Sequence, residues 1–244
     1  MNFNVKFKEE TPPFNVKFGW NNGEYEAGKA EGAKSEYDRF WEAYLSRVNG
    51  YNSMYTFAGT AWDDETFRPH YGAIINANGL AYYMFASTRI KDLKGILQKR
   101  NVTLNFSKCT SCAYLFQNAA TTHIGVVSTL NASDVRYAFE RCLNLKSVDL
   151  VELKSDGSQQ IDHMFRNCTA LESVNISGAI GNNISFQQST KLTKTSITSV
   201  INGLSDTVTG KTATFSKTAK EAAFTDEEWA VLIGTKSNWT IALA

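Results

Sequence analysis

One short phrase recurs between residues 113 and 195, and it constrains the fold more than any other feature of the chain. Phe139 is followed by Cys at +3, Leu at +6 and Val at +9, and the same frame returns from Phe165. Weaker copies start at Phe116 and Phe186, with a small residue in the Cys slot. A repeat of about two dozen residues predicts a solenoid, in which each unit buries its apolar edge against its neighbours.

The slots of the phrase predict its local structure. Phe and Cys three residues apart share one face of a short helical turn, and the alternation that starts at the Val predicts a short strand. Stacked copies would align these slots into a Phe ladder, a Leu ladder and a Val ladder. The Cys slot holds Cys142 and Cys168 but also accepts Ala119 and Ser189, so it requires small volume, which argues against thiol chemistry there.

The phrase resembles the leucine-rich repeats of the BspA-like family, whose unit has the form AFxxCxxLxxV. The match covers roughly residues 80–204, and the best copies contain Cys142 and Cys168. The Ile-Pro strand ending that is usual in the family is missing, and the spacing of the copies is uneven. Members of the family are mostly surface or secreted recognition proteins, so the resemblance implies binding rather than catalysis.

A second repeat opens the chain, where Phe-Asn-Val-Lys-Phe occurs at residues 3–7 and again at 14–18. Each copy alternates apolar and polar residues, the period of a half-buried strand. A lone hairpin is marginally stable in water, so we expect it to dock on this protein, on another copy or on a larger complex. The apolar residues of this predicted docking segment are Phe3, Val5, Phe7, Phe14, Val16 and Phe18.

This opening is similar to that of small structural proteins encoded among the tail genes of phages and prophages of Gram-positive gut bacteria. The first seven residues have no apolar core and no cleavage site, so we expect no secretory signal. Combined with the repeats, the similarity implies a docking module that attaches a recognition solenoid to a virion. The protein would then be made in a bacterial cytoplasm without a signal peptide and reside in the phage tail.

The predicted fold class is α/β: a short leucine-rich-repeat solenoid with a helical N-terminal cap, an α/β C-terminal cap and an N-terminal hairpin-like extension. An aromatic-striped helix is expected over 35–48, and further helices over 90–99 and 192–204. A capping box at Thr225 predicts a last helix, whose Trp229 would cover the final repeat. The expected parts are docking strands 1–19, a linker 20–34, an N-terminal cap 35–80, the solenoid 81–204 and a C-terminal cap 205–244.

Composition argues against several functions. The 244 residues carry a formal net charge of +1 with no basic block, which disfavours nucleic-acid binding. No run of eighteen apolar residues occurs, so we expect no membrane insertion. Cys109 and Cys112 form a C-x-x-C pair without two further ligands nearby in sequence, so zinc and redox chemistry are disfavoured and no cofactor is expected.

Common catalytic motifs are missing from the sequence. The three histidines are scattered, and His163 fills the slot that Tyr137 fills in the preceding copy. The acidic run Asp63-Asp64-Glu65 could serve a cation site or a two-carboxylate glycan hydrolase, but an acidic first turn of a helix accounts for it better. We therefore predict that the protein is not an enzyme.

The leading hypothesis is a non-enzymatic phage tail or baseplate protein that recognises a protein or glycan on the host surface. Its partners would be other tail proteins, bound through the N-terminus, and further copies in a homo-oligomer. A bacterial surface adhesin and a structural virion protein without a receptor are the alternatives. Because a solenoid presents one extended face, we place the binding face at Lys146, Asp149, Glu172 and Asn175.

Overall fold

The computed structural model describes Arg39 and residues 53–60, 62–69, 71–154 and 156–244. The predicted docking segment, the linker and the helix over 35–48 lie outside the described residues, apart from Arg39, which is helical. The chain divides into two compact units, Met1–Phe40 and Trp41–Ala244. The fold described below is that of the second unit.

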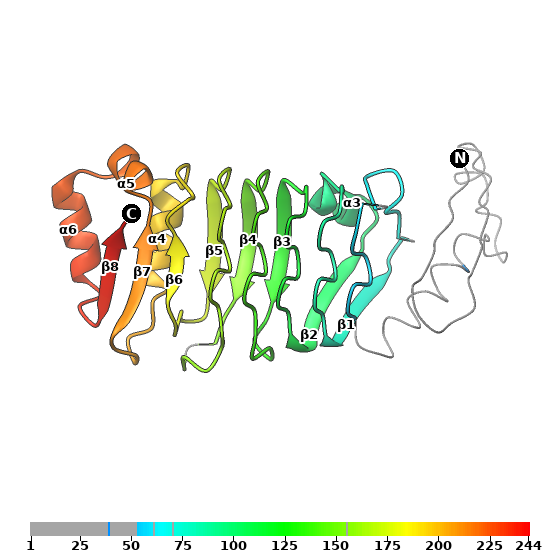
Figure 1. The fold of residues 1–244 in the computed structure, drawn as a ribbon, viewed down its shortest axis with the longest axis horizontal. Helices are drawn as coiled ribbons and strands as arrows, with labels where there is room; N and C mark the ends of the chain where they lie inside the picture. The colour runs from blue at the N-terminus through cyan, green and yellow to red at the C-terminus, as the bar shows by residue number, and fades with distance from the viewer. Residues whose placement is uncertain (1–38, 40–52, 61, 70, 155) are drawn as a thin grey trace. The chain divides into compact units, whose positions relative to one another are not determined.

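Within this unit, a run of strands from β2 to β6 is flanked by helices on both sides in the sequence, and every pairing between named strands is parallel. The strands form three small sheets of order β1-β2, β3-β4-β5 and β6-β7-β8, and they follow one another in chain order (Figure 1). The elements are β1 (Ile74–Leu80), α3 (Leu93–Lys99), β2 (Thr103–Ser111), β3 (His123–Ser128), β4 (Ser147–Glu152), β5 (Ser173–Ser177), β6 (Ile184–Phe186), α4 (Lys194–Asn202), β7 (Lys211–Phe215), α5 (Lys217–Ala223), α6 (Asp226–Gly234) and β8 (Trp239–Leu243).

Successive copies of the phrase are joined by backbone hydrogen bonds beyond the strands as well. The Phe116 N–H donates to the carbonyl of Ala138 at 2.7 Å, and the Asn118 N–H donates to that of Glu140 at 2.8 Å. One copy later, the Phe139 N–H donates to the carbonyl of Met164 at 3.0 Å. Each copy is thus one rung, held to the next along its strand and along its turn.

The predicted Phe ladder is present, and it is longer than predicted. Neighbouring rings lie 4.9 to 5.9 Å apart between centroids, with interplanar angles of 5° to 26°. The ladder runs from Phe57 to Phe215, so the expected boundaries at residues 81 and 205 both fall inside it. The end rungs keep the ring but not the Cys-Leu-Val frame that revealed the repeat. Its seven buried members are Phe57, Phe85, Phe116, Phe139, Phe165, Phe186 and Phe215.

The Cys slot lies in a tight turn, as predicted, and it has a polar role that was not predicted. The Cys142 N–H donates to the carbonyl of Phe139 at 3.2 Å, which closes the turn. The Cys142 thiol donates to the carbonyl of Phe116 at 2.9 Å, and the Cys168 thiol to that of Phe139 at 3.0 Å. In the next rung the Ser189 hydroxyl donates to the carbonyl of Cys168 at 3.1 Å. The slot therefore favours a small donor that reaches back to the preceding rung.

The five rungs from Phe57 to Phe165 also contain two residues each in the left-handed backbone region. The residue two positions before the Phe has φ between 54° and 58°, and the non-glycine residue two positions after it has φ between 56° and 59°. Such values cost about 1–2 kcal/mol for an L-residue, so their recurrence reflects a bend that these five rungs share. The residues concerned are Tyr55, Tyr83, Tyr114, Tyr137 and His163 before the Phe, and Ser87, Asn118, Arg141 and Asn167 after it.

The boundaries of the predicted helices and strands shift for local reasons. Helix α3 begins at Leu93 rather than Ile90, because the Asp92 carboxylate accepts the Gly95 N–H at 3.0 Å and caps the helix there. Strand β2 runs from Thr103 to Ser111.

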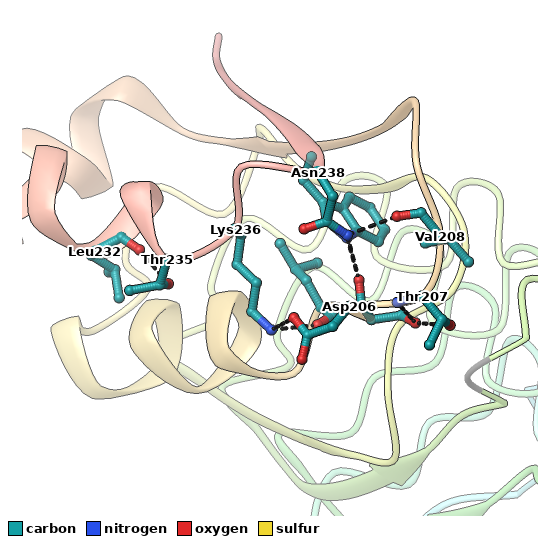
Figure 2. Close-up of polar contacts among 10 residues, drawn as sticks. Asp206, Thr207, Val208, Leu232, Thr235, Lys236 and Asn238 are labelled. Atoms are coloured by element: carbon teal, nitrogen blue, oxygen red, sulfur yellow. Dashed lines mark hydrogen bonds and ion pairs between the residues drawn. The ribbon is translucent and has the colours of Figure 1, made fainter.

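The C-terminal residues close the ladder. The Trp229 ring meets Phe215 edge-on at 6.0 Å, and Thr225 and Glu228 form the predicted capping box of α6. Figure 2 shows the polar contacts that fasten this region to the segment after α4. The buried Lys236 ammonium donates to the Asp206 carboxylate at 2.7 Å, and the Asn238 amide donates to the Val208 carbonyl at 2.7 Å.

Candidate binding site

The acidic run at residues 63–65 forms a turn, which corrects the prediction of a helix start. The Asp63 carboxylate accepts hydrogen bonds from the Thr66 N–H and hydroxyl at 3.0 and 2.9 Å. Partial burial raises the pKa of Asp63, but these hydrogen bonds, one from the Glu65 N–H and the charge of Arg89 together lower it more, so the net shift is downward. The Asp64 carboxylate accepts the Lys91 N–H at 2.7 Å. Asp63 thus closes the turn, and Asp64 fastens it to the segment before α3.

The four cysteines are free and buried. Burial raises the pKa of Cys142 to about 12 and raises that of Cys168. The pKa of Cys112 is raised by its hydrogen bond with Cys109 and by burial. Among the residues that the structure describes, no three His, Cys, Asp or Glu side chains are grouped so as to hold a metal ion.

The four residues of the predicted binding face lie on adjacent rungs. The Asn175 amide on β5 donates to the Asp149 carbonyl on β4 at 3.0 Å, and the Glu172 N–H donates to the Lys146 carbonyl at 2.9 Å. Lys146, Glu172 and Asn175 are exposed, and Asp149 is half-buried. These residues therefore form a polar surface along β4 and β5, which we call the strand face.

A groove of about 460 Å³ adjoins the strand face at Asp149. It lies between α3 and β3, where the first sheet gives way to the second. Val126 is 56% exposed although it is apolar, and it lines the groove. The other apolar side chains in the lining are Leu93, Leu97, Val102, Leu104, Ile124 and Val127.

An ion pair marks the junction of groove and strand face. The Lys94 ammonium on α3 lies 2.7 Å from one carboxylate oxygen of Asp149 and 2.9 Å from the other. Both side chains are about one-third exposed, so the pair adds little to stability, and its main effect is to orient the two charges beside the apolar floor. Sequence reasoning missed Lys94 and Val126, because only the fold brings α3 against β3.

A second surface was missed as well: a column of stacked rings along the left-handed positions, with five rings in the described part of the chain. Centroid distances are 5.0 Å for Tyr55–Tyr83, 4.6 Å for Tyr83–Tyr114, 4.8 Å for Tyr114–Tyr137 and 5.1 Å for Tyr137–His163. Tyr55 is 57% exposed, the next three are half-buried, and His163 is exposed. We call this the ring column. Its signal in the sequence is an aromatic residue two positions before the Phe of the phrase.

Inside the ring column, each ring face is covered by the next ring. Burial raises the pKa of Tyr83 and of Tyr114, and the neighbouring phenols raise it further, because a phenolate beside another phenolate is unfavourable. These tyrosines therefore stay neutral at physiological pH.

Comparison with protein-family models, with curated proteins and with solved structures found no match to this chain. Within the described residues, no helix is both long enough and apolar enough to cross a membrane.

Proposed function

We propose that the protein is a non-enzymatic recognition protein of a phage tail or baseplate that contacts the surface of the host cell. The observation that carries the proposal is the apolar groove beside α3, with the Lys94–Asp149 ion pair at its rim. An apolar floor with a few oriented charges is the usual composition of a binding site, and 460 Å³ lies within the range of about 300–1,000 Å³ for ligand pockets.

The groove and the strand face together suit a protein partner better than a small molecule. The groove would take apolar side chains of the partner around Val126, and the exposed Lys146, Glu172 and Asn175 would meet its polar groups. An apolar centre flanked by polar residues is the common arrangement of protein interfaces.

The leucine-rich-repeat assignment, of the BspA-like kind, is part of the same proposal. It is supported by the repeated phrase, by the parallel strands and by the Phe ladder, which together give the regular face that repeat proteins use for binding. The phage setting is supported by the duplicated opening segment at residues 3–7 and 14–18. In this proposal that segment attaches the protein to other tail proteins and holds the copies of a homo-oligomer together.

The test of binding is competition for attachment. Purified full-length protein is added to the bacterium that serves as host, and the attachment of the phage particles is counted. We expect wild type to block attachment and Val126→Glu, which places a charge in the groove, to block it at least tenfold less well. Leu143→Glu is the matched control, because Leu143 is 52% exposed and lies outside the groove lining.

Two outcomes contradict the proposal. Equal potency of wild type, V126E and L143E would remove the groove from the interface. If wild type has no effect, and antibodies against the protein do not label the tail in electron micrographs, the tail assignment is wrong. Tail labelling without any competition would favour a structural virion protein, and protein on the bacterial surface in the absence of particles would favour an adhesin.

A further inference from the structure

Among the residues that the structure describes, the ring column ends at His163, which is exposed and has a stacked ring on one face. Tyr137 stacks on one face of His163 at 5.1 Å between centroids. The residue that follows in the same slot, two positions before Phe186, is Ile184, which has no aromatic ring. The column therefore stops at the fifth ring, although the Phe ladder continues through Phe186 to Phe215.

The backbone explains why the Ile184 side chain does not cover the outer face of His163. His163 and the four tyrosines before it have φ near +55°, whereas Ile184 lies in the regular strand β6 and is 4% exposed. Its side chain packs in the interior and does not continue the column. Ile184 therefore does not fill the position that a sixth ring of the column would take.

A depression of about 310 Å³ occupies this position. It is lined by His163 and Arg166 from one rung and by Ser185, Gln187 and Gln188 from the next. Its volume is at the lower end of the range for ligand pockets, which suits one small ring. The rest of the lining differs from that of the groove, because apart from His163 it consists of two amides, a hydroxyl and a guanidinium.

Two of these polar groups are oriented by contacts behind them. The Arg166 guanidinium lies 3.4 Å from the Glu140 carboxylate, which is 9% exposed, so its charge is balanced within the site. The Gln188 carbonyl oxygen accepts the Asn167 N–H at 3.0 Å, which fixes the side-chain amide. A charge-balanced site favours a neutral ligand, and oriented donors and acceptors favour one with polar groups around its edge.

We propose that this depression, the His163 site, binds a neutral pyranose ring. The apolar face of the sugar stacks on the outer face of His163, as a sixth member of the column, at the spacing of about 5 Å that the column keeps. Its hydroxyl groups exchange hydrogen bonds with Gln187, Gln188, Ser185 and Arg166. This inference rests on the proposed function for the source of the sugar, a glycan of the host surface. The site itself follows from the geometry of the column.

The test is direct titration of the full-length protein with three probes: methyl β-glucoside, methyl β-galactoside and methyl β-N-acetylglucosaminide, followed by NMR. We expect at least one of them to bind saturably. His163→Asn should weaken it by about 2- to 12-fold, the equivalent of one ring stack. Asn tolerates the left-handed backbone at this position, so the variant should fold, and its thermal unfolding checks this.

Tyr114→Asn is the matched control, because Tyr114 occupies the same slot inside the column and both of its faces are covered. It should bind the glycoside as wild type does. Gln187→Ala, at an exposed edge of the site, should weaken binding without changing stability.

Two results would overturn the inference: no glycoside binds, or the bound glycoside responds equally to H163N and Y114N. If no glycoside binds, titration with p-cresol follows, and its binding at His163 would make the ligand an aromatic side chain. None of these results bears on the attachment test with V126E, so the two proposals fail separately.

Discussion

The molecule contains two columns of stacked rings that differ in their surroundings. The Phe ladder and the ring column share rungs from Tyr55–Phe57 to His163–Phe165, with similar spacing and nearly parallel rings. The Phe rings are at most 1% exposed, whereas Tyr55 is 57% exposed and the other members of the ring column are half-buried or exposed. The two columns have the same stacking geometry and differ in burial. The buried Phe ladder stabilises the fold, whereas the ring column is exposed enough to contact a ligand.

The backbone produces this difference. A phenylalanine in the middle of each bend lies in the interior, while the left-handed residues two positions to either side lie nearer the surface. The Phe ladder continues past the last left-handed pair, at His163 and Asn167, into rungs that lack such residues. The Phe ladder therefore runs through every rung from Phe57 to Phe215, whereas the ring column is present only in the five rungs from Phe57 to Phe165.

The largest effect expected is at the buried column. Phe139→Ala removes a ring that is 1% exposed and stacked on both faces, so it should lower the free energy of unfolding by about 3–5 kcal/mol. Urea denaturation monitored by circular dichroism measures this, with Leu143→Ala at an exposed position of the same rung as control. A loss below about 1 kcal/mol would mean that the ladder does not hold the rungs together.

The interior also predicts a dependence on alkaline pH. The pKa of Cys142 is about 12 in the folded protein, because the thiol is buried, against 9.0 for an ordinary thiol. Between these values the unfolded chain loses a proton that the folded chain keeps. The stability that this thiol contributes is thus fully present below pH 9 and falls by up to about 1.4 kcal/mol per pH unit toward pH 12.

The matching variant is Cys142→Ala, which has a natural precedent at Ala119 in the same slot. Its free energy of unfolding, measured in urea at several pH values, should fall less steeply above pH 9 than that of wild type. The other buried thiols and the two tyrosines whose pKa is raised titrate in both proteins, so most of their contribution cancels in the difference. Parallel slopes for the two proteins would contradict the buried-thiol account.

The bend that separates the columns can be tested at Arg141, whose φ is 58°. Arg141→Val should lower the free energy of unfolding by about 1–2 kcal/mol, because a β-branched side chain is strained in this region. Arg141→Asn should be nearly neutral, since Asn tolerates the same backbone. Thermal unfolding of both variants, with Leu143→Val as control, measures the difference. Equal losses for Val and Asn would show that the bend is not required.

The sequence predicted the parts of the fold that depend on local repetition. The Cys, Leu and Val slots revealed the period of the rungs, and the capping box revealed the start of α6. The ends of the Phe ladder at Phe57 and Phe215 were missed, because only the ring recurs there. The backbone bends were also missed, since Tyr and His give no local signal for a positive φ.

The candidate binding surfaces were predicted less completely. The strand-face residues Asp149 and Asn175 were placed on neighbouring rungs from the repeat alone, and the Asn175 amide donates to the Asp149 carbonyl, although the strand register shifts beside them. Lys94 and Val126 were not, since the groove depends on how α3 packs against β3. The His163 site lies where the ring column ends. The end of the column cannot be inferred from the sequence, because the sequence does not show that these rings stack on one another.

The measurement that tests the account most directly compares the two columns within one rung. Tyr137→Asn removes a half-buried ring at a position where Asn tolerates the backbone, and Phe139→Ala removes the buried ring two residues later. Urea denaturation should give a loss of about 1 kcal/mol or less for Y137N and at least three times more for F139A. Equal losses would contradict the account, because the ring column would then stabilise the fold as much as the interior ladder does.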